Sequence, residues 1–134
     1  MTFLIVHGYF LQGASSNLFV YHTCKSLVKL GHDVILVCQE TDYWSFDIIS
    51  EVLNFEEEDK SFRTVFKKES SFAGTCSLYR SNVGDILPVF LYEPQSTYNA
   101  KEMSFMSEKD LETYIHKNAS AIDVVLSQHS IDII

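Results

Sequence analysis

The fold is decided by residues 3–38, which read FLIVHGYFLQGASSNLFVYHTCKSLVKLGHDVILVC. The run Phe3–His7 is mostly apolar and is followed by a glycine, which is typical of a strand buried on both faces of a parallel sheet. Asp33–Cys38 has the same character. Between these runs, apolar side chains recur at the spacing of one helix face, at Val20, Cys24, Leu27 and Val28. The stretch therefore predicts a strand, a helix and a second parallel strand joined by a right-handed crossover.

Capping residues mark the limits of this first helix. Ser15 or Ser16 can cap its start, and Gly31 can end it in the left-handed conformation that glycine adopts readily. Lys25 and Lys29 lie near its end, where positive charge is favourable to the helix dipole.

A second helix is predicted from Tyr43 to Phe55, where large apolar residues again fall on one side. They are Trp44, Ile48, Val52 and Phe55, and Asp42 precedes them as a candidate N-cap. The acidic run Glu56–Asp59 follows, and it lacks the alternation and the converging partners of a metal site. We expect this run to be a solvated turn.

The middle of the chain changes to strand-like runs. They are Arg63–Glu69, Thr75–Tyr79 and Ile86–Tyr92, separated by turn-forming residues. This pattern predicts a β-hairpin inserted in an α/β domain. Ser107–Asp110 has the form of a capping box, and apolar residues continue after it at helical spacing as far as Leu126. Ile131–Ile134 predicts the beginning of another buried strand, so that the chain ends within an element.

These elements predict one α/β domain over residues 1–134, with a Rossmann-like three-layer architecture, a mainly parallel sheet and an inserted β-hairpin segment. The chain is 46% hydrophobic, which is enough for one buried core. Its formal net charge is −8, and Lys67-Lys68 is its one adjacent basic pair. Because like charges repel, we expect neither nucleic acid nor an anionic membrane as the main partner.

The sequence also predicts a cytoplasmic protein. Residues 1–7 lack the basic region, the longer apolar stretch and the cleavage site of a signal peptide. No apolar run approaches the roughly 20 residues that span a bilayer, so no transmembrane segment is expected. Cys24, Cys38 and Cys76 are odd in number and widely spaced, which suits reduced thiols packed as small core residues.

The loop after the first strand, Gly8–Asn17, is the first candidate for ligand binding, since α/β sheets bind ligands at the carboxyl ends of their strands. Gly8 and Gly13 let backbone amides approach an anion, and the following helix points its first N–H groups at it. The dinucleotide motif G-x-G-x-x-G and the phosphate loop ending in Gly-Lys-Ser/Thr are both absent. A plain strand-to-helix turn is the alternative interpretation.

The five histidines show no metal-ligand spacing, so we predict no bound metal and no cofactor. His7 alone lies at the carboxyl end of a predicted strand, which makes it a candidate for ligand contact together with Tyr9. The other four, His22, His32, His116 and His129, are predicted to be structural.

The segments that carry a family resemblance are Leu4–Tyr9, Gly13–Val20 and Leu30–Gln39, continued by Leu87–Phe90, the helix from Ser107 and Ile131–Ile134. They resemble the opening of family-four retaining glycosyltransferases of the GT-B fold. In these enzymes two Rossmann-like domains face each other across a cleft, and the N-terminal one mainly holds the acceptor. The resemblance implies that this chain is such an N-terminal domain.

The resemblance also implies which residues bind. The family's first loop touches the donor diphosphate, and the residues implied for diphosphate or acceptor binding are Gly8, Gly13, Ala14, Ser15, Ser16 and Asn17. The family commonly has a further glycine where this chain has Ala14 and Ser15. The nucleotide-sugar-binding domain would follow Ile134, with its paired glutamates and a loop histidine near the reaction centre. The intact protein would then transfer a sugar from a nucleotide-sugar donor to an unknown acceptor, and this chain alone would be inactive.

Two other classes of function remain open. Val6–Tyr9 and Gly31–Ile35 also resemble the first strands of α/β-hydrolases, in which a His-Gly turn helps to build the oxyanion hole. The nucleophile elbow G-x-S-x-G of that family is absent. The third alternative is a non-catalytic binding or assembly domain, with homo-association through the edge of the last strand.

Overall fold

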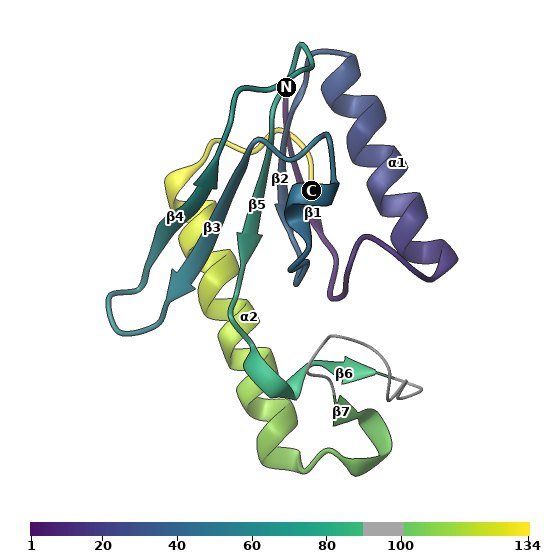
Figure 1. Cartoon of the computed structure of the whole chain (residues 1–134). Coiled ribbons are helices and arrows are strands. Elements are labelled where there is room, and N and C mark those ends of the chain that lie inside the picture. Colours follow the sequence, from purple (N-terminus) through teal and green to yellow (C-terminus); the bar gives the residue numbers. More distant parts are fainter. Residues whose placement is uncertain (90–100) are drawn as a thin grey trace.

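The computed structural model describes residues 1–89 and 101–134, and it begins with the predicted βαβ unit (Figure 1). Strand β1 (Thr2–Val6) pairs in parallel with β2 (Asp33–Val37), and helix α1 (Ser15–Lys29) connects them. Every residue of β2 after Asp33 is buried. Burial on both faces explains why this strand is a continuous apolar run.

Five strands form the main sheet, in the order β1-β2-β5-β3-β4. The remaining bounds are β3 (Glu51–Glu56), β4 (Ser61–Lys67) and β5 (Cys76–Arg80). β5 is parallel to β2 and to β3, and β4 is antiparallel to β3. Beyond the outer edge of β1, Ile133 makes a single parallel bridge with Phe3. The strand predicted over residues 131–134 is represented by this bridge.

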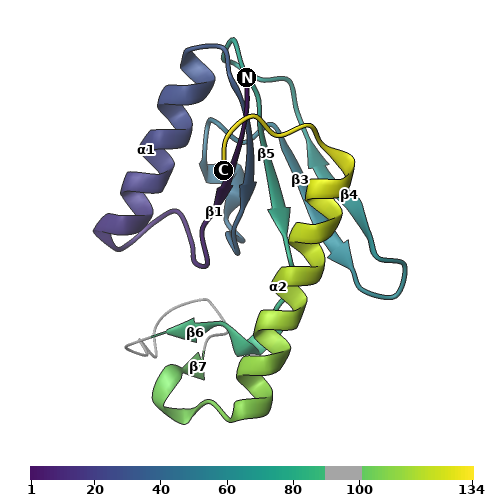
Figure 2. The same ribbon diagram turned by 180° about the vertical axis from the view of Figure 1, so that it is seen from behind.

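Two helices cover opposite faces of the sheet. α1 packs on the face that presents Leu36 and Leu78, whereas α2 (Glu108–Gln128) packs on the face that presents Ile35 and Tyr79. Figures 1 and 2 show α2 running obliquely along the sheet and continuing past the carboxyl ends of its parallel strands. The prediction of an α/β domain with a mainly parallel sheet is confirmed.

The chain crosses the sheet in two opposite directions. α1 leads from β1 to its neighbour β2, whereas α2 leads from β5 back past both of these strands to Ile133. Right-handed crossovers in opposite directions place their helices on opposite faces. The direction reverses between β1 and Ile133, and open α/β sheets bind ligands at the carboxyl ends of the strands near such a point.

The prediction of a helix over residues 43–55 is wrong. The helical part is a single 3-10 turn, η1 (Tyr43–Ser45), and β3 begins at Glu51. Ile48 and Ile49 are almost fully or fully buried, and they lie in the link between η1 and β3. β3 instead pairs with strands on both sides, in a setting that favours β-branched and aromatic residues.

A β-hairpin is present, and its second strand, β4, overlaps the predicted run Arg63–Glu69, whereas its first strand, β3, lies in the segment predicted to be helical. β3 and β4 make the antiparallel pair, and the acidic residues of their turn, Glu57–Asp59, are exposed as predicted. β5, which the sequence places in the inserted segment, belongs to the parallel part of the sheet. The predicted run Ile86–Tyr92 lies partly outside the described residues. Within them are the 3-10 turn η2 (Gly84–Ile86) and the short strand β6 (Pro88–Val89).

A small second sheet precedes α2. β6 pairs in parallel with β7 (Lys101–Glu102), and the 3-10 turn η3 (Met103–Phe105) leads from β7 towards α2. Figure 1 shows these elements below the carboxyl ends of the main sheet, beside the first turns of α2.

The two α-helices begin in different ways. Ser107 and Asp110 form the predicted capping box of α2, in which each side chain accepts the backbone N–H of the other residue. The cap predicted for α1 at Ser15 or Ser16 is wrong, because the N-cap residue is Ala14, which makes no side-chain hydrogen bond. Gly31 has a φ of 84°, as expected for the glycine that ends this helix.

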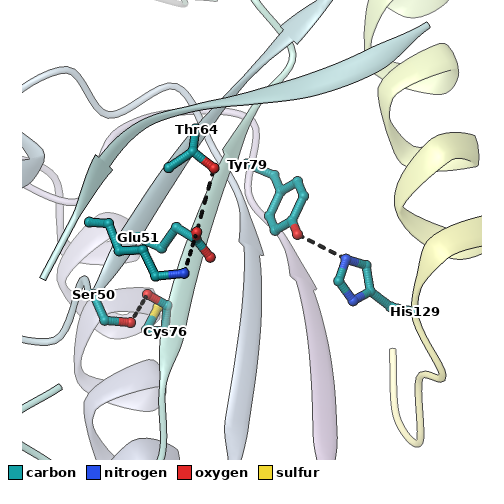
Figure 3. A network of polar contacts seen from close by, with 7 residues as sticks. Ser50, Glu51, Thr64, Cys76, Tyr79 and His129 are labelled. Carbon is teal, nitrogen blue, oxygen red and sulfur yellow. Dashed lines mark hydrogen bonds and ion pairs between the residues drawn. The ribbon is translucent and has the colours of Figure 1, made fainter. Parts of the chain in front are cut away.

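Polar contacts join the strands to each other and to the end of α2 (Figure 3). The hydroxyl oxygen of Tyr79 in β5 lies 2.8 Å from Nε2 of His129, directly after α2, so this histidine is structural as predicted. Burial raises the pKa of the Tyr79 hydroxyl. The Ser50 hydroxyl donates to the carbonyl oxygen of Cys76 at 3.1 Å and ties the start of β3 to β5.

The three cysteines are free thiols and are fully buried. Burial raises the pKa of the Cys38 thiol, and a hydrogen bond with Cys24 together with burial raises the pKa of Cys76. The thiols of Cys38 and Cys76 therefore remain protonated at neutral pH. The prediction that they pack as small core residues is confirmed.

We predict that Gly74→Ala lowers the free energy of unfolding by about 1–3 kcal/mol, the usual cost of overpacking. A Cβ atom added at Gly74 would lie 1.9 Å from the carbonyl oxygen of His32, which is backbone and cannot turn away. Urea unfolding measures the change. Ser71→Ala, at an exposed position of the same loop, is the control and should have no effect. Wild-type stability of Gly74→Ala would contradict this close approach.

We also predict that acid loosens the start of α2. The hydrogen bond from Lys101, followed by those with Ser107, lowers the pKa of Asp110 from 3.8 to about 2. A lowered pKa in the folded state stabilises that state above the unfolded value, and this contribution is lost as the pH falls from 3.8 to about 2. NMR titration of the Asp110 carboxyl carbon measures the midpoint. Lys101→Met should move it up towards 3.8, and a wild-type midpoint already there would refute the prediction.

Candidate functional site

The carboxyl ends of β1, β2 and β5 meet at one edge of the sheet, and the loop after β1 lies along it. This loop, residues 7–14, leads to the start of α1 and lies below β1 in Figure 1. The N–H of His7 donates to the carbonyl of Val37 at 2.8 Å, and the N–H of Gln39 donates to the carbonyl of Tyr9 at 2.9 Å. The loop therefore stays beside the end of β2 before it turns towards α1.

His7 and Asn17 close this loop from the inside. Nε2 of His7 lies 3.0 Å from the carbonyl oxygen of Phe10 and 3.0 Å from Oδ1 of Asn17. Nδ2 of Asn17 donates to the carbonyl of Gln12 at 2.7 Å, which turns its Oδ1 towards His7. Both partners of Nε2 are acceptors, so we assign a hydrogen to Nε2. These two predicted ligand contacts therefore hold the loop in shape.

The carboxylate of Glu40 supports the loop and has no exposed surface. One of its oxygens accepts the N–H of Leu11 at 2.9 Å, and the other accepts the N–H of Asp42 at 2.8 Å. Charge-assisted bonds of this kind compensate a buried carboxylate for its lost hydration. The sequence reasoning missed Glu40. An acidic residue shortly after a buried strand, at the edge where ligands bind, is the signal that could have identified it.

A second buried network fastens α2 to the same edge. Nε2 of Gln39 donates to Oγ of Ser81 at 2.7 Å, and the Ser81 hydroxyl donates to Oδ1 of Asn118 at 2.7 Å. Nδ2 of Asn118 then donates to the carbonyl of Tyr114 at 2.9 Å. The network links the residues after β2 and β5 to the middle of α2, so it positions the part of α2 that meets the loop.

Tyr114 brings α2 into contact with the loop. A Cβ atom at Gly8 would lie 3.1 Å from the Tyr114 hydroxyl oxygen, so glycine leaves room for this side chain. Burial and the neighbouring Tyr9 raise the pKa of Tyr114, which keeps its hydroxyl protonated at neutral pH. The rings of His7 and Tyr9 pack edge to face, with centroids 6.2 Å apart. These four residues form one group at the start of the loop.

The other end of the loop is open to solvent. Residues 13–16 are all exposed, and Gly13 has a φ of 93°, which side-chain-bearing residues rarely adopt. In the described structure, the N–H groups of Ser15 and Ser16 have no hydrogen-bond partner, whereas the next two N–H groups donate to the carbonyl of Ala14. Two bare amides at the positive end of the helix dipole suit an anion.

The structure thus divides the predicted site residues into two groups. Gly13, Ala14, Ser15 and Ser16 lie together at the exposed start of α1. His7, Gly8 and Tyr9 lie in the loop that precedes it, and the side chain of Asn17, in the first turn of α1, bonds back to this loop. Within residues 1–89 and 101–134, no three His, Cys, Asp or Glu side chains are grouped so that they could hold a metal ion. No helix of the same residues is long and apolar enough to cross a membrane.

We predict that Glu40→Gln lowers the free energy of unfolding by about 1.5–3 kcal/mol, the usual worth of a hydrogen bond to a charged group. A carboxamide has one oxygen in place of two, so the amide of Leu11 or of Asp42 loses its acceptor. Hydrogen exchange of these amides, followed by NMR, shows which part of the loop opens. Glu58→Gln in the exposed turn is the control, and unchanged protection of both amides would refute the role of Glu40.

Comparisons with protein-family models, with curated proteins and with solved structures found no match. The fold, the site geometry and the sequence resemblance described above are therefore the basis of the functional proposal.

Proposed function

We propose that this chain is the N-terminal, acceptor-side domain of a retaining glycosyltransferase of the GT-B fold. The observation that supports this most is the start of α1, whose first two N–H groups have no partner in the described structure. It follows the loop after β1, at the point where the crossovers change direction. In the family that residues 4–20 and 30–39 resemble, the loop at this place touches the donor diphosphate. The proposed role of the start of α1 is to donate hydrogen bonds to that diphosphate.

The electrostatics of the loop support this role. The N–H groups of Ser15 and Ser16 are donors without partners in the described structure, and the oxygens of a diphosphate are strong acceptors. The oxygens of the Glu40 carboxylate accept two backbone N–H groups, whose dipoles partly offset its negative charge towards an approaching anion. The bonds of His7 and Asn17 keep the loop in one conformation, so little ordering is needed when a ligand arrives.

These contacts are too weak to hold a nucleotide sugar without help. A helix N-terminus favours an anion by about 0.3–1 kcal/mol at an exposed site, whereas millimolar affinity needs about 4 kcal/mol. We therefore assign the nucleotide and most of the binding energy to a second domain that would face this edge. The chain by itself is expected to bind diphosphate weakly and to transfer no sugar.

We predict that Ser15→Pro removes most of the response of the loop to pyrophosphate. Proline lacks the N–H of the first helical residue, but its fixed φ suits that position. Ala14 has φ −63° and ψ 154°, the extended conformation that a following proline requires, so α1 should stay intact. The measurement is the NMR shift of the amides of residues 13–16 as pyrophosphate is added. We expect a dissociation constant of about a millimolar or weaker in the wild type.

Ser15→Ala is the matched control, because it removes the hydroxyl and keeps the amide, and it should respond as the wild type does. Uridine diphosphate should bind no more tightly than pyrophosphate if the nucleotide belongs to another domain. The absence of any shift at residues 13–16 with either ligand would refute the proposal. Sugar transfer by the 134-residue chain, above a heat-killed control, would refute the assignment of catalysis to two domains.

A further inference from the structure

Two polar side chains at the same edge of the sheet take no part in the function proposed above. Arg80 is the last residue of β5, and Asn54 is its register partner in β3. Nε of Arg80 and Oδ1 of Asn54 are both buried, and neither has a hydrogen-bond partner among the described residues. Buried polar atoms are almost always paired, so an unpaired donor and acceptor on adjacent strands indicate a missing partner.

Both side chains point to the face of the sheet that α1 covers. Side chains alternate along a strand, and Leu78 of β5 and Val52 of β3 lie in the core on the α1 side. Arg80 and Asn54 each come two residues later, so they point to that same face. They lie at the carboxyl end of the sheet, where α/β proteins bind ligands. β2 separates β5 from β1, so this position is distinct from the start of α1.

The charge of Arg80 also lacks a partner. Within the described residues no carboxylate forms an ion pair with Arg80, whereas Nε of Arg63, the other arginine of the chain, lies 2.9 Å from the Glu56 carboxylate. The charge of Glu40 raises the pKa of the Cys38 thiol and the charge of Arg80 lowers it, so both charges lie near Cys38. Glu40 nevertheless directs both of its oxygens to backbone amides. A partly buried cation thus has no anionic partner within residues 1–89 and 101–134, although the chain carries a net charge of −8.

We propose that Arg80 and Asn54 form a binding site for an oxyanion, the phosphate or carboxylate group of a small ligand. A guanidinium binds such groups through two parallel N–H bonds, and one of its two binding edges uses Nε. Oδ1 of Asn54 has no partner in the described structure, so the carboxamide can turn Nδ2 to an anionic oxygen. This site does not rest on the diphosphate contact proposed for α1.

NMR of the arginine Nε–H groups tests the site directly. The chain has two arginines, so two signals are expected, and Arg63→Lys assigns them. Inorganic phosphate and acetate are added in separate titrations, with sodium chloride holding the ionic strength constant. We expect the Arg80 signal to shift and its exchange with water to slow, while the Arg63 signal stays unchanged. The anion with the larger effect identifies the group as phosphate or carboxylate.

Variants then separate specific binding from charge alone. Arg80→Lys keeps the charge but loses the paired N–H donors, and it should weaken binding about tenfold or more, as followed by the backbone amides of residues 80–82. Asn54→Ala should weaken binding by a smaller factor and carries the test if Arg80→Lys does not fold. Arg63→Lys should bind as the wild type does. Ser15→Pro should leave the Arg80 response intact, which separates this site from the one at α1.

Three results would overturn the proposal. The first is no response of Arg80 to either anion. The second is an equal response of Arg63 and Arg80, which would indicate general ionic attraction. The third is an Arg80 Nε–H already protected from exchange without anion and deprotected by Asn54→Ala, which would show that the two side chains bond to each other.

Discussion

The structure depends on the burial of β2 on both of its faces. Leu36 packs on the α1 side and Ile35 on the α2 side, so the strand is covered only while both helices are in place. Burial of apolar surface is the main favourable term in folding, and here it holds β1 and β5 on either side of β2 and one helix on each face. Gln39 and Glu40 follow this strand within three residues, so they lie where the edge of the sheet is held from both faces. Both networks of the candidate site are attached to them.

Local patterns predicted the parts of the fold that depend on neighbours in sequence. The βαβ unit follows from the spacing of apolar residues in one window of the chain, and the capping box at Ser107 from residues within one helical turn. The segment 43–55 misled because its apolar residues fit a helical stripe, while pairing with strands far away in sequence decided its structure. Such pairing also placed β5 inside the parallel sheet. No periodicity within either segment contains this information.

In the candidate site too, the sequence predicted the local features and not those that depend on distant parts of the chain. The loop after β1 and the exposed start of α1 follow from the βαβ unit, because the carboxyl end of a first strand is a local feature. The inward turn of His7 and Asn17 depends on how the loop closes on itself, and the contact of Tyr114 with Gly8 depends on the path of α2. Arg80 and Asn54 are 26 residues apart and meet because β5 inserts between β2 and β3. Only the strand order reveals them as neighbours.

The N-cap of α1 has a consequence for how this protein can change. A serine or aspartate at position 14 would stabilise the helix by about 1 kcal/mol, and alanine there provides no side-chain bond. The oxygen of such a cap would accept the N–H of the second or third helical residue, and Ser16 is the second. A sturdier α1 would thus occupy a donor that is now open to solvent. At Ala14, selection for a more stable helix and selection for an accessible helix start act in opposite directions.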